Sequence, residues 1–373
     1  MKIIHIITSL GDGGAENILR KICKYDLNNE HIIISLKEPD KYSSLIKKMG
    51  IKVYHLNIKF FSILKFFNLI ELLKFLKPDI VQTWLIHGDL IGGIAAKLSG
   101  IKNIIWNVRY SNLKFEKVNL INILLIRILA VLSFIIPRAI IVVSKSAKKN
   151  CEKLGYCKKK LILIVNGYEL SIFKNNLNKR ITFRKKLNID NKIVVLGNVA
   201  RYAKMKDHLT LLKALSLIQS HKINFLCVLI GSEVDKNNLI LVKQIKKLNL
   251  SNNVKLLGKY DDISQVMNGI DIYVQSSKYG EGFPNVVAEA MACQTPCVVT
   301  NSGDASYIVG RVGWVVSPSI PEKLAKTIMN AISEKNNSKW DIRCVKSRLR
   351  IKNFFSIDKM MINYKKLWST VCG

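Results

Sequence analysis

Short, almost uninterrupted apolar runs alternate along the chain with longer segments of helical propensity. In the first half these runs cover residues 3–7, 53–56, 80–83, 104–108 and 139–144. Runs without polar alternation are typical of parallel strands, because helices cover both faces of such a sheet. Alternation of strands with helical segments predicts a doubly wound α/β domain.

A second series of the same kind follows a polar, basic stretch at residues 175–186. Its apolar runs cover residues 193–197, 225–231, 254–258, 271–275, 297–300 and 314–316. Asn166-Gly167 is a turn signal that comes shortly before the polar stretch. The pattern therefore predicts an N-terminal domain at 1–175, a C-terminal domain at 176–350 and a helical tail at 351–373 that packs back on the N-terminal domain.

The most informative stretch begins at Glu281-Gly-Phe-Pro-Asn285, between a predicted strand and a predicted helix from Asn285 to Met291. Pro284 suits the first helical position. A strand, a glycine-containing loop and a helix N-terminus form an anion cradle. We expect Glu281 in the loop and Glu289 just inside the helix, both near its positive end. Two carboxylates beside such a cradle fit a sugar nucleotide; the alternative is a capping acid and a solvated helix acid.

Two cations follow the first predicted strand of the second domain. Arg201 and Lys206 should lie at the carboxyl edge of that strand. Two cations beside a diphosphate can neutralise a leaving group as a metal ion otherwise would. The chain contains no Asp-x-Asp, which removes the obvious carboxylate pair for Mg²⁺. Taken alone, two basic residues in a loop are ordinary surface charge.

A glycine-rich turn follows the first strand. Gly13 and Gly14 precede a helix expected from about Ile18. Glycines at the start of a helix let a ligand approach the backbone closely. The carboxyl end of a first strand is also where open α/β sheets bind ligands.

The charge balance is strongly basic, with 59 Lys and Arg against 26 Asp and Glu. Such a field attracts nucleic acid, acidic lipid or phosphorylated substrates. The alternative explanation for part of this charge is a nucleotide bias of the genome, which the abundance of Lys, Ile and Asn would also reflect. The 8 Cys show neither metal-ligand spacing nor a disulfide framework, which favours a reducing cytoplasm.

Two segments bear on membranes. Residues 120–136 are interrupted by Arg127 and followed by Pro137, so no crossing is expected, and residues 1–7 are too short for a signal peptide. The predicted helix at 59–77 is apolar nearly all round and carries four Lys and one Glu. One face should pack on the sheet while the other suits an anionic bilayer surface. A core helix with snorkelling lysines is the alternative.

Taken together, the motifs resemble the retaining glycosyltransferases of family 4 (group 1), which have the GT-B fold and occur in bacterial surface-polysaccharide synthesis. The resemblance covers nearly the whole chain and rests on six segments in a fixed order. They are Gly13-Gly-Ala-Glu16, residues 82–93, residues 166–173, Arg201-x4-Lys206, Glu281-x7-Glu289 and residues 353–364. The resemblance implies two Rossmann-like domains facing across a cleft.

The same resemblance implies roles for individual residues. Arg201, Lys206 and Glu281 would be catalytic: the two cations hold the diphosphate, and Glu281 binds a hydroxyl of the donor sugar. Glu289 would bind the ribose. The remaining donor-binding positions would be Gly13, Gly14, Lys259, Tyr260, Gly282, Phe283, Pro284 and Asn285, with Lys259 and Tyr260 near the base.

The sequence departs from the family pattern in two places. Gln294 stands where the family usually has glycine, and Trp106–Ser111 stands where many members have a histidine. His87 or Arg109 is then the candidate for the missing role on the acceptor side. A structural role for either residue is the alternative.

By resemblance, the expected activity is metal-independent, cofactor-free transfer of a hexosyl or N-acetylhexosaminyl group. The donor would be a UDP-sugar and the acceptor a lipid-linked saccharide. The enzyme would be cytoplasmic and peripheral on the inner face of an anionic membrane. One rival is a UDP-sugar epimerase of the same fold. The other, a basic nucleic-acid-binding protein, is disfavoured because zinc-finger spacing and ribonucleoprotein motifs are absent from the sequence.

Overall fold

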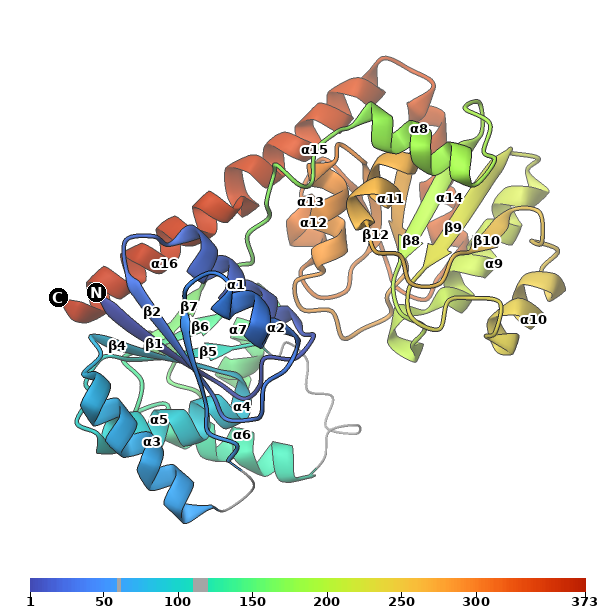
Figure 1. Cartoon of the computed structure of the whole chain (residues 1–373). Helices are drawn as coiled ribbons and strands as arrows, with labels where there is room; N and C mark the ends of the chain where they lie inside the picture. The colour runs from blue at the N-terminus through green and yellow to red at the C-terminus, as the bar shows by residue number, and fades with distance from the viewer. Residues whose placement is uncertain (59–61, 110–119) are drawn as a thin grey trace. The chain divides into compact units, whose positions relative to one another are not determined.

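The computed structural model describes residues 1–58, 62–109 and 120–373, and these form two compact units (Figure 1). Unit 1 comprises residues 1–167 and 358–373, and unit 2 comprises residues 168–357. Both domain boundaries expected from the sequence, after 175 and after 350, fall inside unit 2. The chain joins unit 2 at Tyr168, whose backbone N–H donates to the carbonyl of Phe355 at 2.9 Å. The predicted helix at 59–77 and the segment 106–111 lie partly outside the described residues.

The sheet of unit 1 is parallel, with strand order β3-β2-β1-β4-β5-β6-β7. Its strands are β1 (Lys2–Ile7), β2 (Glu30–Ser35), β3 (Lys52–His55), β4 (Ile80–Trp84), β5 (Ile104–Val108), β6 (Ala139–Val142) and β7 (Leu161–Leu163). The doubly wound α/β prediction is confirmed for this unit. The apolar runs of the sequence do not predict β2 or β7.

Helices cover both faces of this sheet. They are α1 (Gly14–Tyr25), α2 (Lys41–Lys47), α3 (Ile63–Leu76), α4 (Leu85–His87), α5 (Gly93–Leu98), α6 (Leu120–Leu132), α7 (Lys145–Lys153) and α16 (Ile357–Cys372), with a π-helix at Gly88–Gly92 and a 3₁₀ turn at Lys158–Lys160. α1 begins at Gly14, earlier than the start expected near Ile18, because the extended Gly13 takes the N-cap position. α3, α5 and α6 lie on one face of the sheet, and α1 and α16 lie on the other (Figure 1).

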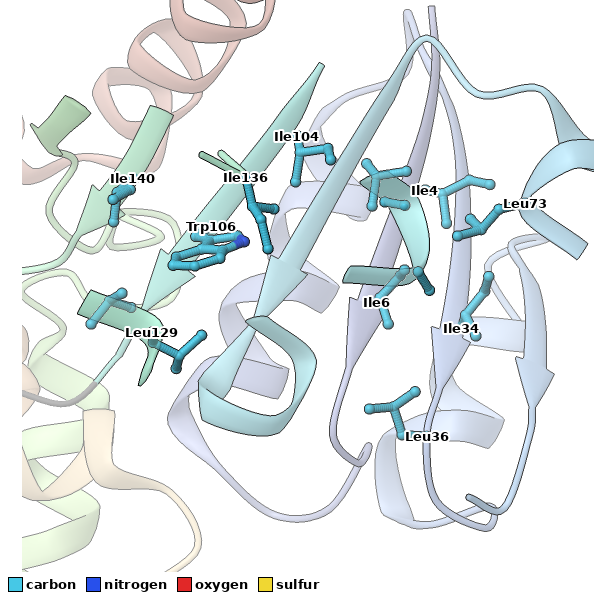
Figure 2. Packing of buried hydrophobic residues seen from close by; sticks show 14 of the residues in the cluster. Ile4, Ile6, Ile34, Leu36, Leu73, Ile104, Trp106, Leu129, Ile136 and Ile140 are labelled. Carbon is cyan, nitrogen blue, oxygen red and sulfur yellow. The ribbon is translucent and has the colours of Figure 1, made fainter. Parts of the chain in front are cut away.

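The core of unit 1 follows from the two-residue period of its strands. Ile4 and Ile6 of β1 point to the side of α3, where they join Leu73, and Trp106 of β5 packs with Leu129 of α6 (Figure 2). These side chains are almost completely buried. The helices of this face are therefore held by apolar contacts.

The sheet of unit 2 is also parallel, with strand order β10-β9-β8-β11-β12-β13. Its strands are β8 (Val194–Val199), β9 (Phe225–Ile230), β10 (Val254–Leu256), β11 (Ile272–Gln275), β12 (Cys297–Thr300) and β13 (Trp314–Val316). Its helices are α8 (Leu177–Lys186), α9 (His208–Ser220), α10 (Leu239–Lys247), α11 (Ile263–Gly269), α12 (Asn285–Ala292), α13 (Ala305–Val309), α14 (Pro321–Lys335) and α15 (Lys339–Phe355), with a 3₁₀ turn at Lys204–Lys206. Each strand predicted for the second domain is found.

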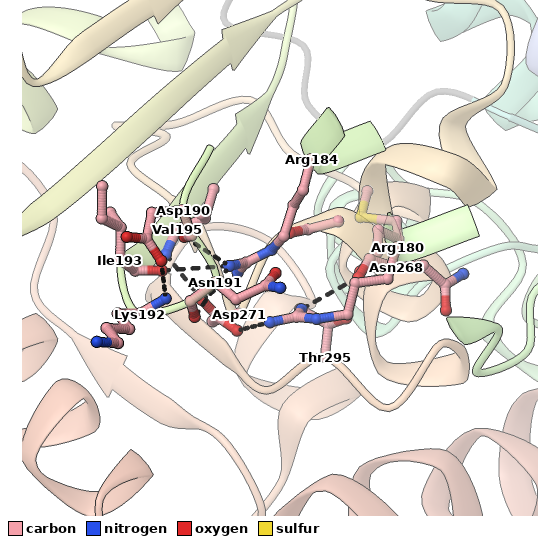
Figure 3. A network of polar contacts seen from close by, with 12 residues as sticks. Arg180, Arg184, Asp190, Asn191, Lys192, Ile193, Val195, Asn268, Asp271 and Thr295 are labelled. Atoms are coloured by element: carbon pink, nitrogen blue, oxygen red, sulfur yellow. Dashed lines mark hydrogen bonds and ion pairs between the residues drawn. The ribbon is translucent and has the colours of Figure 1, made fainter. Parts of the chain in front are cut away.

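A buried ionic network attaches α8 to the sheet of unit 2 (Figure 3). Asp271 accepts from Arg180 and from Arg184, each at 2.7 Å, and from the backbone N–H of Val195 at 2.8 Å. The Arg184 side chain is only 2% exposed. Burial lowers the pKa of Arg184, and the Asp271 carboxylate opposes this shift. Asp271 therefore balances two guanidinium groups at the start of β11.

Within the described part of the chain, no helix combines the length and apolar character needed to cross a bilayer. α3 buries Leu69, Ile70 and Leu73 against the sheet, while Leu64 and Phe67 on its other side remain more than half exposed. The prediction that one face of this helix is left uncovered is confirmed for the described residues.

Candidate functional site

The two central strands of unit 2, β8 and β11, lie where the strand order reverses. At such a switch point the loops leaving the carboxyl ends of the strands diverge and leave a place for a ligand. The loop after β8 reaches Lys206, and the loop after β11 reaches Glu281. Lys278 donates its backbone N–H to the carbonyl of Met205 at 2.8 Å, and Ser276 Oγ donates to the carbonyl of Lys206 at 2.8 Å. These bonds hold the two loops together.

An ion pair forms where the loops meet. Lys206 Nζ lies 2.5 Å from Glu281 Oε1, and Ser277 Oγ donates to the same oxygen at 2.5 Å. The side chains of Lys206 and Glu281 are 19% and 8% exposed. A residue from each loop of the sequence-predicted site is thus brought into direct contact, and the pair is nearly enclosed.

Arg201 follows the end of β8 and is exposed, with no hydrogen-bond or ion-pair partner in the part of the chain that the structure describes. The end of the neighbouring strand β9 holds the loop that carries Arg201. Ala200 donates its backbone N–H to the carbonyl of Ile230 at 2.8 Å. A Cβ on Gly231 would lie 2.2 Å from the Ala200 carbonyl oxygen, so this close approach requires glycine. The guanidinium of Arg201 remains available to an anion.

The loop that carries Glu281 and Gly282 is supported by the loop after β12. Gly303 has a φ of +60°, and a Cβ there would lie 2.2 Å from the carbonyl oxygen of Glu281. Asp304 donates its N–H to the carbonyl of Gly282 at 2.9 Å. Pro284 is the N-cap of α12, in extended conformation, so its expected place as the first helical residue is wrong. The helix starts at Asn285, as predicted, and Pro284 precedes it with a ψ of 101°.

Phe283 and Asn285 are turned toward their own unit. The Phe283 ring stacks on Tyr168 with centroids 6.4 Å apart and meets Phe355 edge-on at 5.5 Å. The Tyr168 hydroxyl donates to Asn285 Oδ1 at 2.7 Å. These contacts anchor the loop, so any contact of Phe283 with a donor would be made through its backbone.

Glu289 lies in the second half of α12, not near its start. Its backbone carbonyl accepts from Cys293 at the C-terminal end of the helix. The expectation that Glu289 lies at the positive end of the helix is therefore wrong. Burial raises the pKa of the Tyr273 hydroxyl, and the charges of Glu281 and Glu289 raise it further.

Lys259 and Tyr260 follow β10, the edge strand of the sheet. Lys259 is exposed. The Tyr260 hydroxyl donates to Gln265 Oε1 at 2.6 Å, and its ring meets Phe183 edge-on at 5.9 Å. Lys186 Nζ lies 5.0 Å from the centroid of the same ring. Tyr260 is therefore integrated into the packing of α8 and α11.

Unit 1 has an equivalent switch point between β1 and β4. Gly13 caps α1 and Gly14 is its first residue. A Cβ on Gly13 would lie 2.2 Å from Glu16 Oε2, whereas nothing lies within 4 Å of a Cβ built on Gly14. Burial raises the pKa of Glu16, while the nearby Arg109 opposes this shift. The close approach at Gly13 is made by the protein's own carboxyl group.

The two acceptor-side candidates differ in their surroundings. Arg109 donates to Asn166 Oδ1 at 2.7 Å and to the Tyr364 hydroxyl at 3.1 Å, and its guanidinium lies 5.0 Å from the Trp84 ring centroid. These contacts lock Arg109 into unit 1. His87 ends α4 and lines a cavity of about 620 Å³. Burial, followed by the charge of Lys37, lowers the pKa of His87.

Sequence reasoning missed a buried acid beside His87. Asp89 lies in the π-helix and is fully buried; Thr83 Oγ1 donates to its Oδ1 at 2.6 Å, while Oδ2 has no partner among the described residues. Burial raises the pKa of Asp89 to about 7. A π-helix is rare and frequently occurs at functional sites, but a single sequence carries no clear signal for one.

One group in the described residues has the spacing of metal ligands: His5, Cys23 and His31. A directed chain of hydrogen bonds already occupies it. Trp84, which can only donate, gives its indole N–H to His5 Nδ1 at 3.2 Å, so His5 Nε2 carries the proton and donates to His31 Nδ1 at 3.0 Å. His31 Nε2 then meets Asp26 at 3.0 Å.

These hydrogen bonds leave neither His5 nor His31 with a free nitrogen lone pair for a metal ion. Burial also raises the pKa of Cys23 to about 12, which disfavours the thiolate that a metal would need. The group is therefore a structural hydrogen-bond network in unit 1.

A family model described as "Glycosyl transferases group 1" matches residues 179–346. The chain is similar to the N,N'-diacetylbacillosaminyl-diphospho-undecaprenol alpha-1,3-N-acetylgalactosaminyltransferase of Campylobacter jejuni, with 31% identity over 277 residues, 70% of this chain and 71% of that protein. It is 25% identical to the UDP-Gal:alpha-D-GlcNAc-diphosphoundecaprenol alpha-1,3-galactosyltransferase of Escherichia coli over 309 residues, 81% of this chain and 78% of that protein.

The solved structure of Anabaena HepE in complex with UDP matches with a TM-score of 0.87 and 21% identity, over 99% of this chain and 100% of that one. This likeness concerns the fold and agrees with two parallel-sheet units of Rossmann type, as expected for GT-B. The matched family segment contains both loops of the unit 2 switch point. The chain therefore belongs to the group 1 glycosyltransferases and has the GT-B fold.

Proposed function

We propose that the protein is a retaining glycosyltransferase that moves a hexosyl or N-acetylhexosaminyl group from a UDP-sugar to a lipid-linked saccharide in surface-polysaccharide biosynthesis. The Escherichia coli relative uses UDP-Gal, by its name, and both relatives act on saccharides linked to diphospho-undecaprenol. These names support the donor and acceptor classes proposed here.

The observation that carries the proposal is the Lys206–Glu281 pair at the switch point of unit 2. A diphosphate bound here would attract the ammonium of Lys206 and the exposed guanidinium of Arg201. Glu281 would then be free to accept a hydrogen bond from a hydroxyl of the donor sugar. Fixed cations in an enclosed site stabilise developing negative charge without reorganisation.

In the proposed reaction, the bond between the anomeric carbon and the diphosphate oxygen breaks as an acceptor oxygen attacks the same face. The departing diphosphate oxygen takes the acceptor's proton, so no side-chain base is needed. Lys206 and Arg201 stabilise the charge that develops on the diphosphate. Because two side-chain cations supply this charge, we propose a metal-independent, cofactor-free reaction and expect EDTA to leave the rate unchanged.

We further propose that the enzyme works on the inner, anionic face of the cytoplasmic membrane through an apolar surface of unit 1. This apolar surface consists of the exposed side chains Ile63, Leu64, Phe67 and Phe75 of α3 and Ile121, Leu124 and Val131 of α6. Lys74 and Lys77 lie beside it at the end of α3. Exposed apolar side chains with nearby lysines suit the interface of an anionic bilayer.

The test is a two-stage assay on the purified chain. UDP-sugars are first screened for protection against thermal unfolding, where a ligand at one hundred times its Kd adds ~2.7 kcal/mol. The protecting donor is then incubated with a diphospho-polyprenyl saccharide, and the anomeric configuration of the product is read by NMR. Protection followed by an axial-to-axial or equatorial-to-equatorial outcome supports the proposal. An inverted product, or conversion of the UDP-sugar to its epimer without acceptor, contradicts it.

A further inference from the structure

The cavity of about 620 Å³ in unit 1 has a size typical of small-molecule sites, which span ~300–1,000 Å³. Most of its wall is hydrocarbon, supplied by Leu36, Ile58, Phe66, Leu90 and Leu125. Phe66 belongs to α3 and Leu125 to α6, so the cavity lies between the two helices that carry the apolar surface. Its shape and lining suit a flexible hydrocarbon chain.

One end of the cavity is polar. Thr8 follows β1, Lys37 follows β2 and His87 ends the short helix after β4, so all three lie at the carboxyl edge of the sheet. Thr8 Oγ1 is buried and has no hydrogen-bond partner within the described ranges. Lys37 is exposed, and its charge acts on His87. A hydroxyl, an ammonium and an imidazole together can bind a phosphate group.

The apolar wall continues into the exposed apolar surface. Ile63 lines the cavity and is also 70% exposed. Leu125 lines the cavity, and its neighbour Leu124 is 59% exposed. A molecule with an anionic head and a long hydrocarbon tail can therefore place its head at Thr8, Lys37 and His87, and its tail can leave over α3 and α6.

We infer that this cavity binds the first isoprenoid units of a polyprenyl diphosphate, with the diphosphate at Thr8, Lys37 and His87. The choice of an isoprenoid carrier rests on the proposed function, because both relatives act on saccharides attached to diphospho-undecaprenol. The cavity would hold the lipid carrier of the acceptor and thereby present the saccharide at the carboxyl edge of unit 1.

The direct test is the binding of farnesyl diphosphate to the full chain, measured by calorimetry without detergent. Farnesyl diphosphate should bind at least about tenfold more tightly than inorganic diphosphate, because the hydrocarbon chain is buried. It should also bind more tightly than dodecyl phosphate. Equal affinity for farnesyl diphosphate and inorganic diphosphate would overturn the inference. Equal affinity for farnesyl diphosphate and dodecyl phosphate would contradict the choice of an isoprenoid as the bound chain.

A pair of matched substitutions locates the site. Ser62 lines the cavity, whereas Ser44 is exposed on α2. Ser62→Phe fills the cavity and should weaken farnesyl diphosphate binding about tenfold, while Ser44→Phe should leave it unchanged. Equal affinity in the two variants would place the lipid elsewhere. The unliganded melting temperature of each variant shows whether it is folded.

A charge reversal at the exposed Lys37 provides a second variant that does not disturb the core. Lys37→Glu should weaken farnesyl diphosphate about fivefold or more and leave farnesol unaffected. Protection by UDP is measured on the same samples and tests the proposed function separately. Cavity-dependent farnesyl diphosphate binding without UDP binding would overturn the proposed function alone. The reverse result would overturn only the lipid site.

Discussion

The two units share a strand order through their first six strands but use their switch points for different chemistry. In unit 2, loops from β8 and β11 meet in the enclosed Lys206–Glu281 ion pair. In unit 1, segments following β1 and β4 border a cavity with a largely hydrocarbon wall, with Thr8 and His87 at its edge. The same topology therefore presents ionic groups in one unit and an amphipathic cavity in the other. This difference agrees with the proposed use of a charged, water-soluble donor and a lipid-borne acceptor.

The largest effect is expected from removing the ion pair of unit 2. Lys206→Ala should lower kcat by about 10²–10³-fold, because a fixed charge beside the leaving group is lost. Lys204, exposed in the same short 3₁₀ turn, is the matched control, and Lys204→Ala should stay within about twofold of the unaltered protein. Initial rates with a saturating donor measure both. Similar losses in the two variants would mean that general loop charge, rather than the pair, matters.

Loss of the Asp271 network should have the largest effect on stability. Asp271→Ala leaves Arg180 and the buried Arg184 without their carboxylate, and breaking such a buried pair costs roughly 3–5 kcal/mol. Urea unfolding monitored by circular dichroism measures the change. Glu71→Ala removes an exposed partner of Lys74 and should cost less than ~1 kcal/mol. Equal costs would show that Asp271 is not the anchor of α8.

In unit 1, Asp89 makes stability depend on pH. Its pKa is raised from 3.8 to about 7 by burial, so the folded state holds a proton that the unfolded state has already released. The contribution of Asp89 to the free energy of unfolding therefore falls by about 1.4 kcal/mol per pH unit between about 4 and 7.

Asp89→Asn removes this titration and keeps an acceptor for Thr83. The variant should gain stability over the unaltered protein as pH rises to 7, with the difference levelling off above that value. Urea midpoints at pH 5 and pH 8 measure it. Identical pH profiles of the two proteins would show that Asp89 ionises normally.

The smallest effect is expected for membrane binding. Replacing Leu64, Phe67 and Phe75 of α3 with Ser should reduce binding to anionic vesicles severalfold, since three exposed apolar side chains are lost. Leu239 and Ile240 of α10 are equally exposed apolar residues in unit 2. Their replacement with Ser should leave vesicle sedimentation unchanged. A similar loss of vesicle binding in the α3 and α10 variants would show that the exposed apolar residues of unit 1 have no special role at the membrane.

Much of the fold follows from the local pattern. Strands such as β5 and β12 were located to the residue, because buried parallel strands need continuous apolar runs. β7 is missed although β13, which also has 3 residues, is found, so strand length alone does not explain the difference. In α6 an apolar run does not mean burial, because Leu124 and Val131 are exposed. Periodicity reports which side chains are apolar, and tertiary packing decides which of them are covered.

The candidate site was predictable in its parts but not in its contacts. The motifs pointed to Lys206 and Glu281, which the fold joins although they are 75 positions apart. Glu289 is misplaced although the start of α12 at Asn285 is predicted correctly, because the fifth residue of a helix of 8 residues is already past its positive end. The cavity beside His87 depends on how α3 and α6 pack, which no local spacing encodes.

The position of α16 has a consequence for biosynthesis. Trp368 donates to Gln82 at 2.9 Å, and Tyr364 accepts from Asn107 at 3.0 Å, so buried amides of β4 and β5 find their partners on a helix that is translated after unit 2. During translation, the side chains of Gln82 and Asn107 therefore lack these hydrogen-bond partners until unit 2 has been synthesised. A premature stop before Tyr364 would therefore damage the unit encoded first, although the codons of its sheet are intact.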